Sequence, residues 1–201
     1  MRDLPPILVV VSAPSGAGKT TLCDRLLAEC DGMVYSVSCT TRAPRGEEVD
    51  GEDYCFLSES SFQARVAAGD FLEHASVHGH RYGTLRSTVE NALREGHSVL
   101  MDIDVQGAGQ IREALYAASL DDPIASHWVD IFIGPPNGAA LRERLERRGE
   151  DAPQVIEERL KNADAEMARS GEFRYMVIND DLDKAFLRLR DIVLSEAGGK
   201  T

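Results

Sequence analysis

The stretch that decides the fold is ILVVVSAPSGAGKTT, residues 7–21. Its first five residues form an unbroken apolar run, which is typical of a strand that is covered on both faces. A glycine-rich loop follows at once, and from Lys19 onwards the leucines have helical spacing, which predicts a helix over about 19–30. We therefore expect a buried strand, a tight loop and a helix in direct succession.

The loop, APSGAGKT at 13–20, matches the phosphate-loop pattern G-x-x-x-x-G-K-[ST], except that Ala13 replaces the first glycine. Gly16 and Gly18 let backbone N–H groups turn inward as an anion-binding nest, beside the positive end of a helix dipole. A glycine turn that binds nothing is the alternative, but the flanking strand and helix favour a phosphate site. The residues expected to hold ATP here are Ala13, Pro14, Ser15, Gly16, Ala17, Gly18, Lys19, Thr20 and Thr21.

A magnesium site is expected beside this loop, because phosphate-loop enzymes hold Mg²⁺ from a second strand as well. The apolar run SVLMDI at 98–103 predicts that strand, with Asp102 at its end and Asp104 two residues further on. In an extended chain the two carboxylates point the same way. Solvation of a strand end is the alternative, but two acids at one strand mouth favour Mg²⁺ bound by Thr20 and Asp102.

Further apolar runs at 128–133 and 175–179, separated by helical patterns, predict an α/β fold with a parallel core sheet between helical layers. The segment 34–90 differs, because its strand candidates are short and more polar and one helix, near 59–68, interrupts them. It predicts a small mixed β-rich insert. The arginine-rich helical segment 138–170, broken by RRGEDAP, predicts a mobile lid.

A chain of 201 residues is long enough for one domain with a sizeable core. We expect a single domain over 1–201, with its core at about 1–33, 91–137 and 171–201. No apolar run approaches the ~20 residues that span a bilayer. The amino-terminal residues also lack the pattern of a secretory signal.

The net charge of −12 repels nucleic-acid backbones and anionic membranes, so neither is expected as a partner. An anionic substrate would need a local cluster of arginines. No C-x-x-C pair occurs, and we interpret the cysteines as reduced thiols of a cytoplasmic protein: Cys23, Cys30, Cys39 and Cys55. A polar loop explains the histidine cluster more simply than a metal does: His74, His78 and His80.

Three longer strings resemble the guanylate kinases: SVSCTTRAPRGEEVDGEDY at 36–54, FLEHASVHGHRYGT at 71–84 and LMDIDVQG at 100–107. T-T-R-x-P-R and D-I-D-x-Q-G are much more specific than the phosphate loop, and the resemblance continues to VINDDLDKA at 177–185. It implies a phosphate-loop kinase that transfers the γ-phosphoryl group of ATP to GMP with Mg²⁺, in purine nucleotide metabolism. It also implies a GMP-binding insert and a helical lid. Use of dGMP and the choice between monomer and homodimer stay open.

The resemblance also implies roles for single residues. Those that match the grip on the GMP phosphate are Arg42, Arg45, Tyr54 and Tyr82. Those that match the guanine-reading site are Ser38, Glu73, Thr84 and Asp104. Gly83 matches the small residue between two of these, and Asp102 is also expected in the GMP site. The expected catalytic cations are Lys19, Arg42 and the lid arginines Arg144, Arg148 and Arg159. Asn179 falls on the adenine side, and Gly46 and Glu47 replace the family's Pro-Gly after Arg45.

The chemistry of guanine agrees with this assignment. Its N1–H and exocyclic amino group are donors, and the carboxylates of Glu73 and Asp104 are acceptors only. Two alternatives stay open: a kinase of the same fold that phosphorylates a sugar phosphate, and a guanylate-kinase-like module that binds phosphopeptides without turnover. The paired carboxylates favour a base-reading pocket over the first, and Lys19, Thr20 and the lid arginines favour an enzyme over the second.

Overall fold

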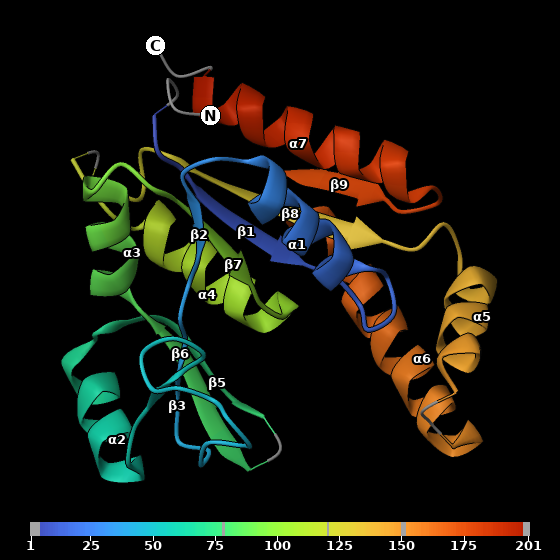
Figure 1. Ribbon diagram of the computed structural model, residues 1–201, viewed down its shortest axis with the longest axis horizontal. Helices are drawn as coiled ribbons and strands as arrows, with labels where there is room; N and C mark the ends of the chain where they lie inside the picture. The colour runs from blue at the N-terminus through green and yellow to red at the C-terminus, as the bar shows by residue number, and fades with distance from the viewer. Residues whose placement is uncertain (1–4, 78, 120, 150–151, 199–201) are drawn as a thin grey trace.

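The computed structural model describes residues 5–77, 79–119, 121–149 and 152–198, which form two sheets with helices around them (Figure 1). The larger sheet has five parallel strands in the order β2-β7-β1-β8-β9. These strands are β1 (Leu8–Ser12), β2 (Met33–Tyr35), β7 (Ser98–Asp102), β8 (Trp128–Gly134) and β9 (Tyr175–Ile178). Because all five are parallel, their carboxyl ends meet at one edge of the sheet. The predicted parallel core is confirmed.

Helices cover both faces of this sheet, which gives the predicted three layers. On one face lie α1 (Lys19–Glu29) and α7 (Leu182–Gly198), and on the other lie α3 (Arg86–Arg94) and α4 (Val105–Tyr116). Strand β1 is buried on both sides: Val9 packs toward α1 and α7, whereas Val10 packs toward α3 and α4. The uninterrupted run of apolar residues in the sequence is a direct result of this double burial.

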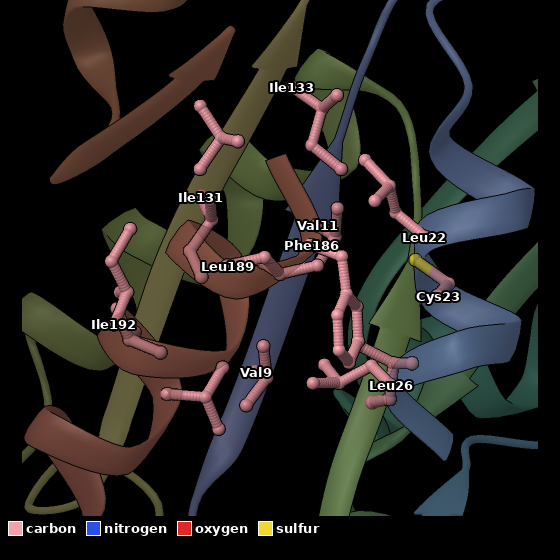
Figure 2. Close-up of a cluster of buried hydrophobic side chains, with 14 of the residues drawn as sticks. Val9, Val11, Leu22, Cys23, Leu26, Ile131, Ile133, Phe186, Leu189 and Ile192 are labelled. Carbon is pink, nitrogen blue, oxygen red and sulfur yellow. The ribbon is translucent and has the colours of Figure 1, made fainter. Parts of the chain in front are cut away.

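The core on the side of α1 and α7 interlocks side chains from both helices and from the sheet (Figure 2). Phe186 of α7 is fully buried there, beside Leu26 of α1 and Val9 of β1. The guanidinium of Arg25 lies over the Phe186 ring, 4.0 Å from its centroid, and closes the cluster toward solvent. This packing fixes α1, and therefore the loop before it, against the sheet.

The smaller sheet has four strands in the order β4-β3-β6-β5, and it is mixed, as predicted. Its strands are β3 (Cys39–Thr40), β4 (Cys55–Phe56), β5 (Phe71–Val77) and β6 (His80–Leu85). Helix α2 (Glu59–Ala68) begins at the capping hydroxyl of Ser58 and ends at Gly69, whose φ is 72°. Strand β5 lies at the edge of this sheet.

Both ends of the segment 34–90, which the sequence analysis gives to the insert, fold with the core. The segment begins within β2, and Val34 of β2 pairs with Val99 of β7 in the parallel sheet. At the other end, α3 buries Val89 and Leu93 against the core. The short, partly exposed β2 carries too little apolar sequence to be distinguished from the strands of the insert.

The remaining helices form a pair with its own small core. These are α5 (Gly138–Arg148) and α6 (Pro153–Ala168), followed by the 3₁₀ turn η1 (Ser170–Glu172). Leu141, Leu145 and Ile156 are buried between them. We call this pair the lid. Within the described ranges, no helix is long and apolar enough to cross a membrane.

The packing of Phe186 predicts a large loss of stability when its ring is removed. Phe186→Ala should lower the free energy of unfolding by about 3–5 kcal/mol, because it leaves a cavity between α7 and the sheet. Leu187→Ala is the matched control, since the neighbouring Leu187 is 45% exposed and should change the free energy by less than about 1 kcal/mol. Urea unfolding measures both, and equal losses would contradict this account of the core.

Candidate active site

The loop between β1 and α1 has two glycines in the left-handed region, with φ of 89° at Gly16 and 93° at Gly18. Their neighbours also exclude a side chain. A Cβ at Gly16 would lie 2.9 Å from Leu145 and 3.0 Å from Leu141, both on the lid helix α5. A Cβ at Gly18 would collide with the Asn179 side chain. The lid and the end of β9 are therefore packed against the bare backbone of the loop.

A set of hydrogen bonds ties the same three elements together. The Asn179 amide, which is buried, donates to the carbonyl of Ala17 at 2.7 Å. Arg144 of α5 donates to the Asn179 carbonyl at 2.6 Å and to the Ala17 carbonyl at 3.5 Å. Beside this clamp lies a cavity of about 290 Å³ lined by Gly16, Gly18, Thr21, Arg144, Arg147, Asn179 and Leu182.

An ion pair joins the loop to the neighbouring strand. Val11 of β1 is in register with Asp102 of β7, so the first turn of α1 and the end of β7 lie side by side. The ammonium of Lys19 contacts the Asp102 carboxylate directly. A cavity of about 370 Å³ opens here, lined by residues 13–16 and 18–21 of the loop region and by Asp102, Asp104 and Glu166.

A third cavity, of about 210 Å³, lies between β7 and the mixed sheet. It is lined by Ser38, Tyr54, Glu73, Ala75, Val77, Tyr82, Asp102, Ile103 and Asp104. Residues that are distant in the sequence and that were predicted to bind one ligand therefore do face one cavity. Asp102 and Asp104 line this cavity and the phosphate-loop cavity, so the two spaces meet at these carboxylates.

Glu73 is the most deeply buried acid of this third cavity, with 6% of its surface exposed. Its carboxylate accepts a hydrogen bond from the Thr84 hydroxyl at 2.9 Å. The pKa of the Glu73 carboxyl is raised to about 7, chiefly because burial disfavours the charged form; the charge of Asp104 also raises it, whereas the Thr84 bond lowers it. A ligand that donates hydrogen bonds to this group would therefore stabilise its charged form.

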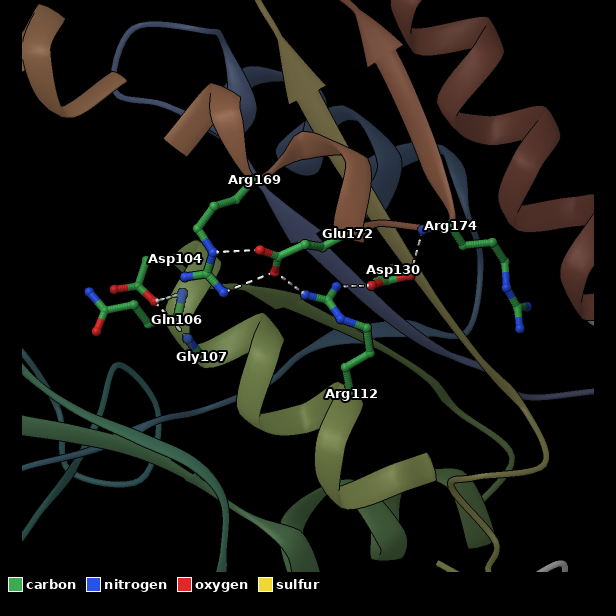
Figure 3. Close-up of polar contacts among 8 residues, drawn as sticks. All are labelled: Asp104, Gln106, Gly107, Arg112, Asp130, Arg169, Glu172 and Arg174. Carbon is green, nitrogen blue, oxygen red and sulfur yellow. Dashed lines mark hydrogen bonds and ion pairs between the residues drawn. The ribbon is translucent and has the colours of Figure 1, made fainter. Parts of the chain in front are cut away.

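Asp104 caps α4 through one carboxylate oxygen, which accepts from the backbone N–H groups of Gln106 and Gly107 at 3.0 and 2.8 Å. Figure 3 shows this cap at the start of α4 and, beyond it, a chain of ion pairs that reaches the lid. In that chain Glu172 of η1 accepts from Arg169 at 2.9 Å and from Arg112 of α4 at 3.0 Å. The end of the lid is therefore anchored on α4.

Arg42 is held in a fixed orientation by Glu48. Two guanidinium nitrogens donate to the two carboxylate oxygens of Glu48, each at 2.9 Å, and the guanidinium lies 5.1 Å from the centroid of the Tyr54 ring. The backbone N–H of Arg45 also donates to Glu48, at 2.7 Å. Gly46 has φ of 55° in this turn, so the replacement of the family's Pro-Gly is accommodated by a hydrogen-bonded turn from Arg45 to Glu48.

A family model described as guanylate kinase matches residues 6–196. The chain belongs to the guanylate kinase family. A guanylate kinase of Paraburkholderia xenovorans is 47% identical over 94% of this chain and 80% of its own length, and one of Thermotoga maritima is 45% identical over 94% and 86%. A crystal structure of guanylate kinase from Anaplasma phagocytophilum is similar with a TM-score of 0.69 at 31% identity, covering 98% of this chain and 89% of that one.

The chain is thus a guanylate kinase, an enzyme that transfers the γ-phosphoryl group of ATP to GMP and forms ADP and GDP. The resemblance seen in the sequence and the predicted α/β class are both confirmed. Its substrates carry negative charge, and in this acidic enzyme Lys19, Arg144 and Arg147 line the cavities described above.

Not every predicted site residue reaches these cavities. Arg45 is exposed on its turn, and Arg159 lies partly buried on α6. Gly83 is needed by the strand pairing, since a Cβ there would lie 2.9 Å from the Glu73 carbonyl oxygen. The side chain of Arg148 and the whole of His78 lie outside the described residues.

The roles of three charged residues of the site are not predicted from the sequence. Glu48 orients Arg42, Glu166 of the lid lines the phosphate-loop cavity, and Arg147 lines the cavity beside the Asn179 clamp. The role of Glu48 could have been predicted from its position three residues after Arg45, because an acidic residue in a turn that carries two arginines is close enough to form an ion pair with one of them. The other two depend on how the lid packs, which no local pattern reveals.

The raised pKa of Glu73 predicts how stability depends on pH. The folded enzyme holds a proton on Glu73 between about pH 4.5 and pH 7, where the unfolded chain has lost it, so the stability from this group falls as pH rises through that window. The loss should reach about 3 kcal/mol at pH 8. Glu73→Gln does not titrate and should lack this decline.

Urea unfolding of the wild type and of Glu73→Gln at pH 5 and pH 8, without nucleotide, measures the difference. A decline of the same size in both proteins would show that Glu73 keeps an ordinary pKa in the folded enzyme.

Proposed function

We propose that the phosphate-loop cavity, with the cavity beside Asn179, holds ATP, that the cavity beside Glu73 holds GMP, and that the phosphoryl group passes between the two nucleotides beside Asp102 and Asp104. The observation that carries this proposal is that these two carboxylates line both the phosphate-loop cavity and the cavity beside Glu73. One space is bounded by the glycine loop and Lys19, and the other by Glu73 and the tyrosines. A donor and an acceptor bound in this way would have their phosphates facing each other.

ATP would bind with its phosphates in the loop of residues 13–21. Backbone N–H groups of the loop and the amino end of α1 supply an anion site, and Lys19 supplies the cation for the β- and γ-phosphates. The adenine would lie in the cavity beside Asn179. Because the Asn179 amide is bonded to Ala17, we assign to it the shaping of the loop, with Arg144 and Arg147 facing the nucleotide.

The residues present fit a bound Mg²⁺. Thr20 and Asp102 offer oxygen ligands on the wall of one cavity. Within the described part of the chain no group of three or more acidic, histidine or cysteine side chains could hold a metal by itself, which suits Mg²⁺, since this ion takes few protein ligands beside phosphate oxygens and water. When bound with ATP, Mg²⁺ would neutralise charge on the phosphates. Lys19 would then exchange its contact with Asp102 for the nucleotide.

GMP would bind in the smaller cavity. Glu73 and Asp104 accept from the guanine N1–H and amino group, and Ser38 with Thr84 completes the polar edge. Arg42, Arg45, Tyr54 and Tyr82 would receive the phosphate. The Glu48 pair keeps the Arg42 guanidinium in one orientation, which lowers the entropy cost of binding the phosphate.

The transfer needs no general base. A phosphate monoester has its second pKa near 6, so an oxygen of GMP is already anionic when it attacks the γ-phosphorus. Lys19, Arg42 and the lid arginines Arg144, Arg148 and Arg159 would stabilise the charge that spreads over the transferring group. Closure of the lid and of the mixed sheet over the core would exclude water and so prevent hydrolysis of ATP.

We further propose a division of labour along the chain: the parallel sheet with α1, α3, α4 and α7 as the core, residues 36–85 as the GMP-binding insert, and α5 with α6 as the lid. A role in purine nucleotide metabolism and a cytoplasmic location follow from the reaction and from the interpretation of the cysteines as reduced thiols.

Lys19→Ala tests the phosphate-loop assignment. The variant should lose at least about a thousandfold in kcat, because the cation nearest the transferring group is removed. Circular dichroism should show an unchanged fold. A coupled assay of ADP release with ATP and GMP measures the loss, and activity within tenfold of the wild type would contradict the assignment.

Glu73→Gln tests guanine recognition. The KM for GMP should rise by about 10- to 100-fold while the KM for ATP stays within twofold, because the amide offers only one acceptor to two guanine donors. Glu95→Gln is the control, since the Glu95 side chain is 71% exposed and lies on the core. Equal increases in both KM values would remove Glu73 from guanine recognition.

A further inference from the structure

The outer edge of β5 is paired with a side chain instead of a strand. β5 is the last strand of the mixed sheet, with β6 on one side only. On the other side the side-chain amide of Gln110, from α4, meets the backbone of His74. The Gln110 carbonyl oxygen accepts from the His74 N–H at 3.0 Å, and the Gln110 amide nitrogen donates to the His74 carbonyl at 2.9 Å. The side chain thus makes the two bonds that a residue of a neighbouring strand would make.

Gln110 belongs to the face of α4 that is directed toward this part of β5. Asp104, Gly107 and Gln110 are spaced three residues apart, which places them on one side of the helix. Asp104 caps the helix and lines the smaller cavity. A Cβ at Gly107 would lie 3.0 Å from the Glu73 carboxylate, so the glycine makes room for it. Gln110 then holds the next residue of β5.

The strand needs this support at that point. The pairing of β5 with β6 is irregular between Phe71 and Glu73, so the regular ladder does not by itself set where Glu73 points. Thr84 contacts the Glu73 side chain, whereas the N–H and the carbonyl of the next residue, His74, both bond to the side-chain amide of Gln110 on the free edge of β5. Because recognition by hydrogen bonds is sensitive to displacements of about 1 Å, the position of this edge bears directly on the ligand.

We propose that Gln110 is a positioning residue for guanine recognition: its amide fixes β5 on α4, and so sets the distance between the two guanine-reading carboxylates, Glu73 and Asp104. Gln110 itself does not line the cavity. The inference deepens the proposed function, because it rests on the assignment of Glu73 to guanine. It also makes α4 the common support of both carboxylates.

Gln110→Met tests the inference, because methionine keeps the length and bulk of the side chain and removes both hydrogen bonds. The KM for GMP should rise about tenfold, while the KM for ATP stays within twofold. Gln110→Glu, at pH 8, keeps the acceptor for the His74 N–H but faces the His74 carbonyl with a second acceptor, so its effect should be at least as large. Gln63→Met is the matched control: this amide in α2 bonds only to the exposed Glu59, at 3.0 Å, and its loss should leave both KM values unchanged.

A double-mutant cycle separates positioning from general destabilisation. If Gln110 acts through Glu73, then Gln110→Met should add no more than about twofold to the KM for GMP in the Glu73→Gln background. A full tenfold increase in that background, an equal increase in the KM for ATP, or an unchanged KM for GMP with only a lower melting temperature would each overturn the inference.

The cycle also distinguishes a failure of the positioning role of Gln110 from a failure of the guanine assignment of Glu73. If Glu73→Gln raises the KM for GMP and Gln110→Met does not, the positioning role fails and the proposed function stands. If Glu73→Gln has no selective effect on GMP, the guanine assignment fails and the role of Gln110 fails with it.

Discussion

The alignment of two neighbouring parallel strands is the constraint on which the rest of this enzyme depends. Because Val11 of β1 is in register with Asp102 of β7, the glycine loop begins at the edge of the sheet where the Asp102 carboxylate also lies. The ion pair between Lys19 and Asp102 is the direct result. The next turn of chain after Asp102 carries Asp104, which brings the same edge into contact with the mixed sheet.

Local charge pairing explains how a chain with a net charge of −12 can receive two anionic nucleotides. Several cations of the site are held by an oxygen of the protein: Lys19 by Asp102, Arg42 by Glu48 and Arg144 by the Asn179 carbonyl. Such partners fix the direction of the guanidinium groups before any ligand arrives.

The sequence was sufficient for those parts of the fold that are specified by local pattern. β1 and β7 are continuous apolar runs because both of their faces are covered, and the loop between 12 and 19 is specified by its glycines. β2 was misplaced because three residues of mixed burial do not show which sheet they join. The roles of Gln110 and Glu166 could not be predicted, because they depend on which face of a helix contacts another element. That orientation is determined only by the packing of the whole chain.

The contact between Gly16 and the two leucines of α5 gives one position of the phosphate loop a double duty. The bare backbone at Gly16 serves at once as the floor of a cavity and as the seat of Leu141 and Leu145. The positive φ at Gly16 disfavours a side chain independently of the space around it, so trimming one of those leucines would not by itself allow a larger residue there. Selection on the backbone of the loop therefore also preserves the surface on which the lid leucines rest.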